Sequence, residues 1–204
     1  MICISTAINN VRRNNTTDVV VFTADILAKI EREQYLTNMF SGALENREFV
    51  AFYQPKVDLT DGSLCGCEAL VRWRRGDKLI SPGEFIPVFE RDGNICALDF
   101  YMLDQVCRDI KEWIEQGLQP VTVSVNFSKT HLHDPDIADK IISIIKNYDI
   151  DTRYIEVEMT EMSDFNDYNA FKAFVSKLKE NGVITSIDDF GTGYSSLNLL
   201  TDFM

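Results

Sequence analysis

Positive charge is scarce in this chain. Its 20 lysines and arginines face 32 aspartates and glutamates, which leaves a net charge of −12 at pH 7. A surface that binds a nucleic acid polymer needs an excess of positive charge, so this balance argues against such a partner. An acidic protein that handles an anionic substrate instead needs metal ions or local arginines to offset the repulsion.

Long apolar runs are also missing, and we expect no secretory leader in the residues at hand. No apolar run approaches the ~18 residues of a membrane helix, and residues 1–7 lack the basic start of a signal peptide. The five cysteines are scattered, Cys65-Gly66-Cys67 does not have C-x-x-C spacing, and neither histidine lies near it. We therefore expect small, buried, reduced cysteines and a cytoplasmic location, with any membrane anchor of the parent protein further upstream.

The length and composition predict one globular domain with a short extension. The chain has 204 residues, of which 45% are hydrophobic, as in soluble globular proteins. Residues 1–22 hold at most a short helix and a short strand, which cannot bury a core by themselves. Apolar side chains recur at helical spacing over residues 23–46 and predict a connecting helix. We expect the main domain to occupy residues 47–204.

A hairpin is predicted at the start of this domain. Residues 49–59 and 64–74 both read as strands, and Thr60-Asp61-Gly62 between them is a turn sequence. Along the second strand, Leu64, Gly66, Glu68, Leu70 and Arg72 share one face. A carboxylate and a guanidinium beside leucines are unusual for a simple solvent face, so we expect this face to look into a functional cavity.

Helices and strands alternate through the rest of the domain. Strands are predicted over residues 121–127, 154–159 and 183–188, and helices over 85–90, 94–116, 136–148 and 165–181. Alternation of this kind is typical of a parallel sheet with crossover helices. The predicted fold class is α/β.

Polar side chains recur near the carboxyl ends of the predicted strands. Glu68, Asn126, Glu158 and Asp188 each lie opposite the apolar face of their strand. In a closed β/α barrel these strand ends form one rim, where active sites lie. Carboxylate and amide oxygens suit Mg²⁺ or Mn²⁺, and the adjacent Asp189 adds a ligand for a second ion.

Each of these residues also has a purely structural interpretation. Glu68 and Arg72 form an ion pair in one alternative, Asn126 forms a turn, and Glu158 caps a helix. The Asp188-Asp189 pair, which precedes a loop with two glycines, reads equally as an Asx-rich turn between a strand and a helix. A common metal site explains all of them together.

Several motifs resemble those of the EAL domain family. Glu68-Ala69-Leu70 is similar to the signature that names the family, and Val71-Arg72-Trp73 follows it. The other matching motifs, in family order over about residues 47–204, are Tyr53-Gln54-Pro55, Ser81-Pro82, Phe85-Ile86-Pro87, Val125-Asn126-Phe127-Ser128, Glu158-Met159-Thr160-Glu161 and Asp188-Asp189-Phe190-Gly191-Thr192-Gly193. The resemblance implies a TIM-type (β/α) barrel with an antiparallel first strand.

The resemblance also implies an activity and a role for each matching residue. EAL domains hydrolyse cyclic di-GMP to the linear dinucleotide pGpG with a pair of Mg²⁺ or Mn²⁺ ions. By position, Glu68, Asn126, Glu158 and Asp188 resemble the metal ligands, and Asp189 resembles the ligand of the second metal. Gln54 and Arg72 resemble substrate contacts, with Arg72 on a phosphate. Glu161 resembles the residue that stabilises the Asp188–Gly193 loop, and the region Asp188–Ser196 implies a homodimer contact.

The chain departs from the family pattern in two places. The family has a lysine-bearing strand after the Asp-Asp loop, whereas no lysine follows Lys179 here. A complete β/α barrel needs on the order of 250 residues, so we expect an incomplete barrel that lacks its last strands and helices. Residues 1–22 weakly resemble the end of a GGDEF-type domain, which often precedes an EAL domain.

Two functions therefore remain open. One is a metal-dependent cyclic di-GMP phosphodiesterase, and the other is an inactive fragment that binds cyclic di-GMP or regulates a partner. The metal-ligand motifs favour the first for the parent protein, and the missing lysine favours the second for this chain. We expect the chain alone to hydrolyse cyclic di-GMP very poorly.

Overall fold

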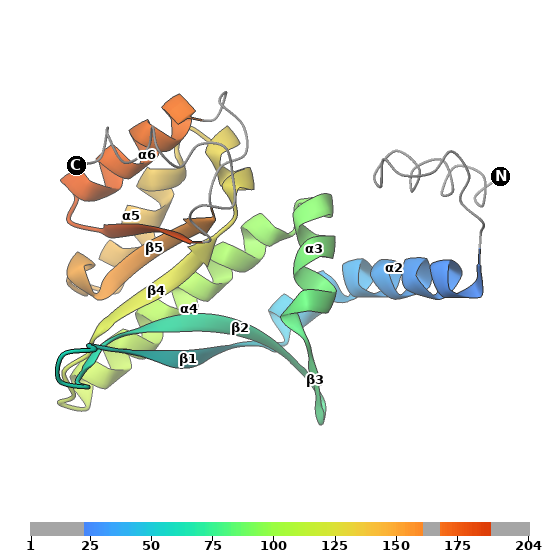
Figure 1. The fold of residues 1–204 in the computed structure, drawn as a ribbon, viewed down its shortest axis with the longest axis horizontal. Helices are drawn as coiled ribbons and strands as arrows, with labels where there is room; N and C mark the ends of the chain where they lie inside the picture. Colours follow the sequence, from blue (N-terminus) through green and yellow to red (C-terminus); the bar gives the residue numbers. More distant parts are fainter. Residues whose placement is uncertain (1–22, 161–167, 189–204) are drawn as a thin grey trace. The chain divides into compact units, whose positions relative to one another are not determined.

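The computed structural model describes residues 23–160 and 168–188 (Figure 1). The chain divides into two units, residues 1–40 and 41–204, and helix α2 (Ala24–Glu45) carries the chain from one to the other. The Thr23 hydroxyl accepts a hydrogen bond from the Ile26 amide (3.4 Å) at the start of α2. At its end Arg47 takes a left-handed conformation (φ 54°), and the Glu48 amide donates to the Ala43 carbonyl (2.9 Å). The predicted helix is confirmed, and its role as a connector stays a prediction.

The second unit contains a six-stranded sheet in the order β1-β2-β4-β5-β6, with β3 paired to β2. The strands are β1 (Phe49–Val57), β2 (Leu64–Arg75), β3 (Lys78–Ile80), β4 (Thr122–Phe127), β5 (Ile155–Thr160) and β6 (Ile184–Asp188). The β1–β2 pair is antiparallel, and β2, β4, β5 and β6 are parallel to one another. The predicted hairpin, the antiparallel first strand and the α/β class are confirmed, and the arrangement is consistent with a partial TIM-type barrel.

Strand β3 was not expected from the sequence. It turns back from the end of β2 through Gly76 and Asp77, and Gly76 takes the positive φ (57°) that a two-residue hairpin loop favours. Ile80 is buried, whereas Leu79 is exposed. Three residues are too few for alternation to stand out in a sequence, because that signal needs about four residues or more.

Helices follow the strands along the chain. They are α3 (Pro82–Asp92), α4 (Ile95–Glu115), α5 (Ile137–Asn147) and α6 (Tyr168–Glu180), with short 3-10 helices η1 (Lys129–His133) and η2 (Thr152–Tyr154). Helix α4 lies against β1, β2 and β4, and α6 lies against β6 (Figure 1). Pro82 occupies the first turn of α3 and Gly93 ends it with φ 82°, so the helix extends beyond the predicted residues 85–90 at both ends. None of the described helices is long and apolar enough to cross a membrane.

The apolar side of the sheet packs on these helices. Strands β4 and β5 contribute alternate residues to this core, namely Val123, Val125, Phe127, Ile155, Val157 and Met159. A separate aromatic cluster surrounds Trp73 of β2. Its ring centroid lies 4.9 Å from that of Phe49 on β1 and 5.7 Å from that of Phe85 on α3. The Trp73 indole N–H donates to the Glu48 carboxylate (2.8 Å), which satisfies the polar atom of a fully buried side chain.

The opposite side of the sheet carries most of its polar side chains, together with a few apolar ones such as Phe52 and Leu70. Alternation along the strands places the following residues there, and we call them the polar face: Gln54, Lys56, Glu68, Arg72, Ser124, Asn126, Glu156, Glu158, Ser186 and Asp188. This face is the one that the sequence pattern of β2 assigned to a functional cavity. The helices bury one side of the sheet, and the predicted ligands and substrate contacts on its strands lie on the other side.

The cysteines are only in part the buried residues that we expected. All four in the described ranges are free thiols, and Cys67 and Cys107 are buried. Cys65 is exposed, because it lies at the start of β2 next to the exposed hairpin turn, and Cys96 is partly exposed.

Candidate functional site

The register of the sheet brings the predicted ligands onto neighbouring strands. Gln54 pairs with Glu68 across the antiparallel hairpin. Asn126 pairs with Glu158 across the parallel β4–β5 ladder, and Asp188 is the last residue of β6. Asn126, Glu158 and Asp188 lie within the last three residues of parallel strands, which end at the same edge, whereas Glu68 lies inside β2.

A direct hydrogen bond links two of the predicted ligands. The Asn126 amide nitrogen donates to Glu68 Oε1 over 2.8 Å and so connects β4 with β2. Asn126 lies inside strand β4, so the alternative of a turn-forming asparagine is wrong. Its amide oxygen is the atom that suits a hard cation, since the nitrogen is held by Glu68.

A lysine that the sequence did not single out lies among these acids. The Lys56 ammonium donates to the Ser124 hydroxyl (2.7 Å) and to Glu158 Oε2 (3.3 Å), and it lies 3.6 Å from Glu156 Oε2. The Ser124 hydroxyl in turn donates to the Glu156 carboxylate. Lys56, Ser124 and Glu156 lie two residues from Gln54, Asn126 and Glu158 on the same face, and that alternation is the signal by which they could have been found.

The pKa of the Glu158 carboxyl is raised, in part by the negative charges near it. Burial raises this pKa most, the contact with Lys56 opposes the rise, and the charges of Glu68 and Asp188 raise it further. Burial lowers the pKa of the Lys56 ammonium, but the charges of Glu158, Glu156 and Glu68 outweigh it and the net direction is upward. Glu158 therefore lies close enough to both Glu68 and Asp188 to interact with them electrostatically.

The donor set fits a hard divalent cation by its chemistry. It offers three carboxylates and one amide oxygen on one face, the ligand types that Mg²⁺ and Mn²⁺ take. Next to Glu158 in the β5–β6 register, the buried Ser186 hydroxyl has no hydrogen-bond partner. Within residues 23–160 and 168–188, however, no three acidic, histidine or cysteine side chains lie close enough together to hold a metal as they stand.

The predicted substrate contacts lie on the same face. Gln54 is exposed. The Arg72 guanidinium lies 5.7 Å from the Phe52 ring centroid, and one of its nitrogens donates to the Val71 carbonyl (2.8 Å). Among the described residues Arg72 forms no ion pair with Glu68, so that structural alternative is wrong. Glu158 likewise lies within strand β5 and does not cap a helix.

Two predicted site residues lie outside the described residues. These are Asp189, predicted to hold a second metal, and Glu161, predicted to stabilise the loop. The proposed dimer contact over Asp188–Ser196 also falls there, apart from Asp188 itself. Their roles stay predictions.

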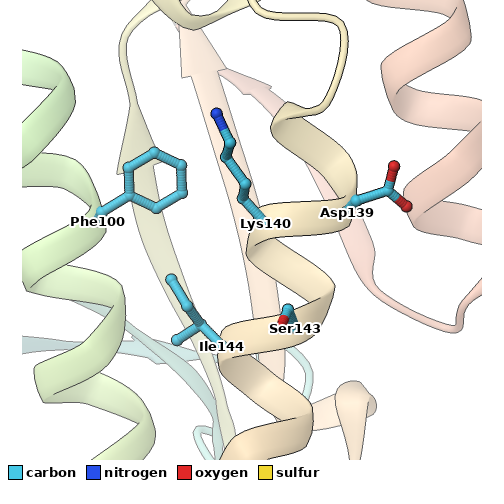
Figure 2. Close-up of a pocket in the computed structure, with 5 residues that line it drawn as sticks. All are labelled: Phe100, Asp139, Lys140, Ser143 and Ile144. Atoms are coloured by element: carbon cyan, nitrogen blue, oxygen red, sulfur yellow. The ribbon is translucent and has the colours of Figure 1, made fainter.

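A hollow of about 520 Å³ lies elsewhere in the domain, and we do not consider it a candidate functional site. It is lined by Phe100 of α4 and by Asp139, Lys140, Ser143 and Ile144 of α5 (Figure 2). Lys140 is paired with Asp134 (2.5 Å), and Asp139 accepts a hydrogen bond from Lys177. Because the charged side chains of the hollow already have partners, it offers no convergent set of groups for a ligand.

The fold is that of an α/β domain consistent with a partial TIM-type barrel, with several acidic side chains on one face of its sheet. The chain belongs to the EAL domain family, which matches residues 37–204. It is 32% identical over 177 residues to the bifunctional diguanylate cyclase/cyclic di-GMP phosphodiesterase MucR of Pseudomonas aeruginosa, covering 86% of this chain and 26% of MucR. It is also 32% identical over 180 residues to the cyclic di-GMP phosphodiesterase NbdA of the same organism, covering 88% of this chain and 23% of NbdA.

The solved structures agree with this assignment. The PaMucR phosphodiesterase in complex with c-di-GMP superposes with a TM-score of 0.74 at 35% identity, over 81% of this chain and 68% of that one. The FimX EAL domain of Xanthomonas citri, at 22% identity and a TM-score of 0.75 over 86% of this chain and 68% of that one, supports the fold alone. The chain spans about a quarter of the length of the curated relatives that it matches.

Proposed function

We propose that this chain carries the substrate- and metal-binding part of a cyclic di-GMP phosphodiesterase that forms linear pGpG in bacterial second-messenger signalling. The observation that carries the proposal is the polar face, where Glu68, Asn126, Glu158 and Asp188 come from the neighbouring strands β2, β4, β5 and β6. The likeness to MucR and NbdA, whose names state this activity, supports it.

In this proposal the acidic residues hold Mg²⁺ or Mn²⁺. Glu68, Asn126, Glu158 and Asp188 bind one cation, and Asp188 with Asp189 binds the other. When bound, the cations activate water as Lewis acids and neutralise phosphate charge. They also supply the positive charge that a chain of net charge −12 lacks for an anionic dinucleotide.

The other residues of the site orient the substrate. Arg72 binds a phosphate, for which its guanidinium is suited because it presents several donors in one plane. Gln54, exposed beside Glu68, makes a second polar contact. Glu161 stabilises the loop after β6, and Asp188–Ser196 contributes to a homodimer. We further propose that residues 1–22 are the end of a GGDEF-type domain and that the domain acts in the cytoplasm.

One observation favours a second function, binding of cyclic di-GMP without cleavage. In the described residues the Lys56 ammonium contacts Glu158 Oε2, and the carboxylates do not form a closed metal-holding group. A site of this kind can still bind a phosphate through Arg72 while positioning metals poorly for hydrolysis.

Turnover and binding of cyclic di-GMP separate the two functions. We expect slow hydrolysis to pGpG by excess protein with Mn²⁺, lost in Glu68→Gln and retained in Glu112→Gln, the same change at an exposed site on α4. Removing a metal ligand is expected to cost ~10² or more in rate. Binding without hydrolysis in the unmodified chain would establish the second function, and no binding at all would contradict both.

A further inference from the structure

Lys56 reaches its acidic partners by crossing over a glycine. It lies on β1 opposite Gly66 of β2, yet its ammonium contacts Ser124 on β4 and Glu158 on β5. A Cβ at Gly66 would lie 3.9 Å from both the Cβ and Cδ of Lys56. Because Gly66 has no side chain, the aliphatic part of the Lys56 side chain can lie across it on the polar face.

Lys56 forms ion pairs with two acidic residues of β5, Glu156 and Glu158. Glu156 Oε2 lies 3.6 Å from the Lys56 ammonium and Glu158 Oε2 lies 3.3 Å from it. The Lys56 side chain is 40% exposed, whereas those of Glu156 and Glu158 are 19% and 11% exposed. Two carboxylates withdrawn from water this far need a compensating positive charge, and Lys56 supplies it from within the fold.

We propose that Lys56 is an internal counter-ion that stabilises the metal-free acidic site and weakens its affinity for divalent cations. The inference rests on the proposed metal site for its second part only. The ammonium donates to Glu158 Oε2, one of the two carboxylate oxygens with which Glu158 would hold a cation. A cation held by Glu158 would lie within a few ångströms of the ammonium, and the two positive charges would repel each other.

This repulsion is expected to outweigh the loss of the Lys56–Glu158 hydrogen bond. Glu158 remains fixed by the β4–β5–β6 ladders when Lys56 is replaced, and a bound cation gives the carboxylate a new partner. An unscreened interaction of one and two charges at such a distance is large even at a high effective dielectric constant. We allow for the partial exposure of Lys56 and expect a change of about ten-fold in metal affinity.

Substitution of Lys56 tests both parts. Lys56→Met keeps the length of the stem and removes the charge, Lys56→Arg keeps the charge, and Lys56→Gln is a second neutral variant should the methionine variant fail to fold. Lys177→Met is the matched control, because it removes the same formal charge from an ion pair with Asp139 on the outer helices. The readouts are the thermal midpoint in a chelator and the affinity for Mn²⁺.

The expected result is a lower midpoint and about ten-fold tighter Mn²⁺ binding in the neutral Lys56 variants. Lys56→Arg should stay near the unmodified chain, and Lys177→Met should leave Mn²⁺ affinity unchanged. Unchanged or weaker Mn²⁺ binding in Lys56→Met would overturn the inference. If the unmodified chain binds no Mn²⁺, the metal part of the proposed function fails, and an unchanged midpoint without metal would then refute the counter-ion.

Discussion

Asp99 is a buried carboxylate away from the polar face, on helix α4. One of its oxygens accepts the backbone N–H of Ser128 (2.8 Å) and lies 3.1 Å from His131 Nε2. His131 is itself buried against the rings of Phe100 and Phe127. Because Ser128 follows Asn126 by two residues, this contact fixes the path of the chain just beyond a predicted metal ligand.

The pH dependence of stability should carry a contribution from Asp99. Burial, the largest cause, raises the pKa of its carboxyl, and the hydrogen bonds from His131 and Ser128 only partly oppose this. The folded state therefore holds the proton more tightly than the unfolded chain, so Asp99 costs stability as the pH rises above the usual Asp range. We expect the stability of Asp99→Asn relative to the unmodified chain to increase from pH 4 to pH 7. Urea unfolding at several pH values measures it, and parallel profiles would contradict it.

At the scale of elements, the two glycines Gly42 and Gly66 should respond oppositely to substitution. A Cβ at Gly66 would lie 3.2 Å from the Thr122 carbonyl and beside the Lys56 stem, whereas a Cβ at Gly42 in α2 meets nothing within 4 Å. Gly66→Val should therefore destabilise by ~1–3 kcal/mol through overpacking. Gly42→Ala should stabilise α2 by ~0.5–1 kcal/mol. Thermal or urea unfolding of the two variants checks this, and a stabilising Gly66→Val would show that β2 has room to shift.

The elements that the sequence predicted are those with a sustained pattern. The hairpin, the parallel strands and α4 each carry several turns or alternations of apolar residues. The face that holds Glu68 and Arg72 followed from alternation along β2, which the pairing with β1 bears out. Strand β3 is too short to carry such a pattern.

Lys56 could not be placed for a different reason. Its partners Ser124 and Glu158 lie 68 and 102 residues away, and only the strand order brings them together. A sequence pattern reports which face a residue takes, but not which distant side chain it meets there. The ion pairs of the polar face could therefore be identified only from the structure, whereas the residues that share this face could be predicted from the sequence.

At the scale of the whole molecule, the chain should gain stability from divalent cations beyond the effect of salt. Its net charge is −12, and the negative charges of Glu68 and Asp188 raise the pKa of the Glu158 carboxyl on the polar face. A cation that binds only the folded chain stabilises it by about 2.7 kcal/mol at 100 times its Kd. We expect Mn²⁺ and Mg²⁺ to raise the thermal midpoint above that in NaCl of equal ionic strength.

Asp188→Asn provides the control for this prediction. It should lose most of the increase, because it removes a proposed charged ligand at the end of β6 while leaving the strand pairing intact. An increase of the same size in Asp188→Asn would assign the effect to general screening of the acidic surface.

The strand order also has a consequence for how the domain folds. The β1–β2 hairpin pairs residues as close in sequence as Gln54 and Glu68, whereas the Asn126–Glu68 bond closes a separation of 58 residues and the Lys56–Glu158 bond one of 102. Closing a loop of that length costs more chain entropy than forming the local hairpin. We therefore expect the hairpin to form early and the polar face to be completed last. The ion pairs of the polar face should then mainly slow unfolding, which lengthens the lifetime of the native state, and should have little effect on the folding rate.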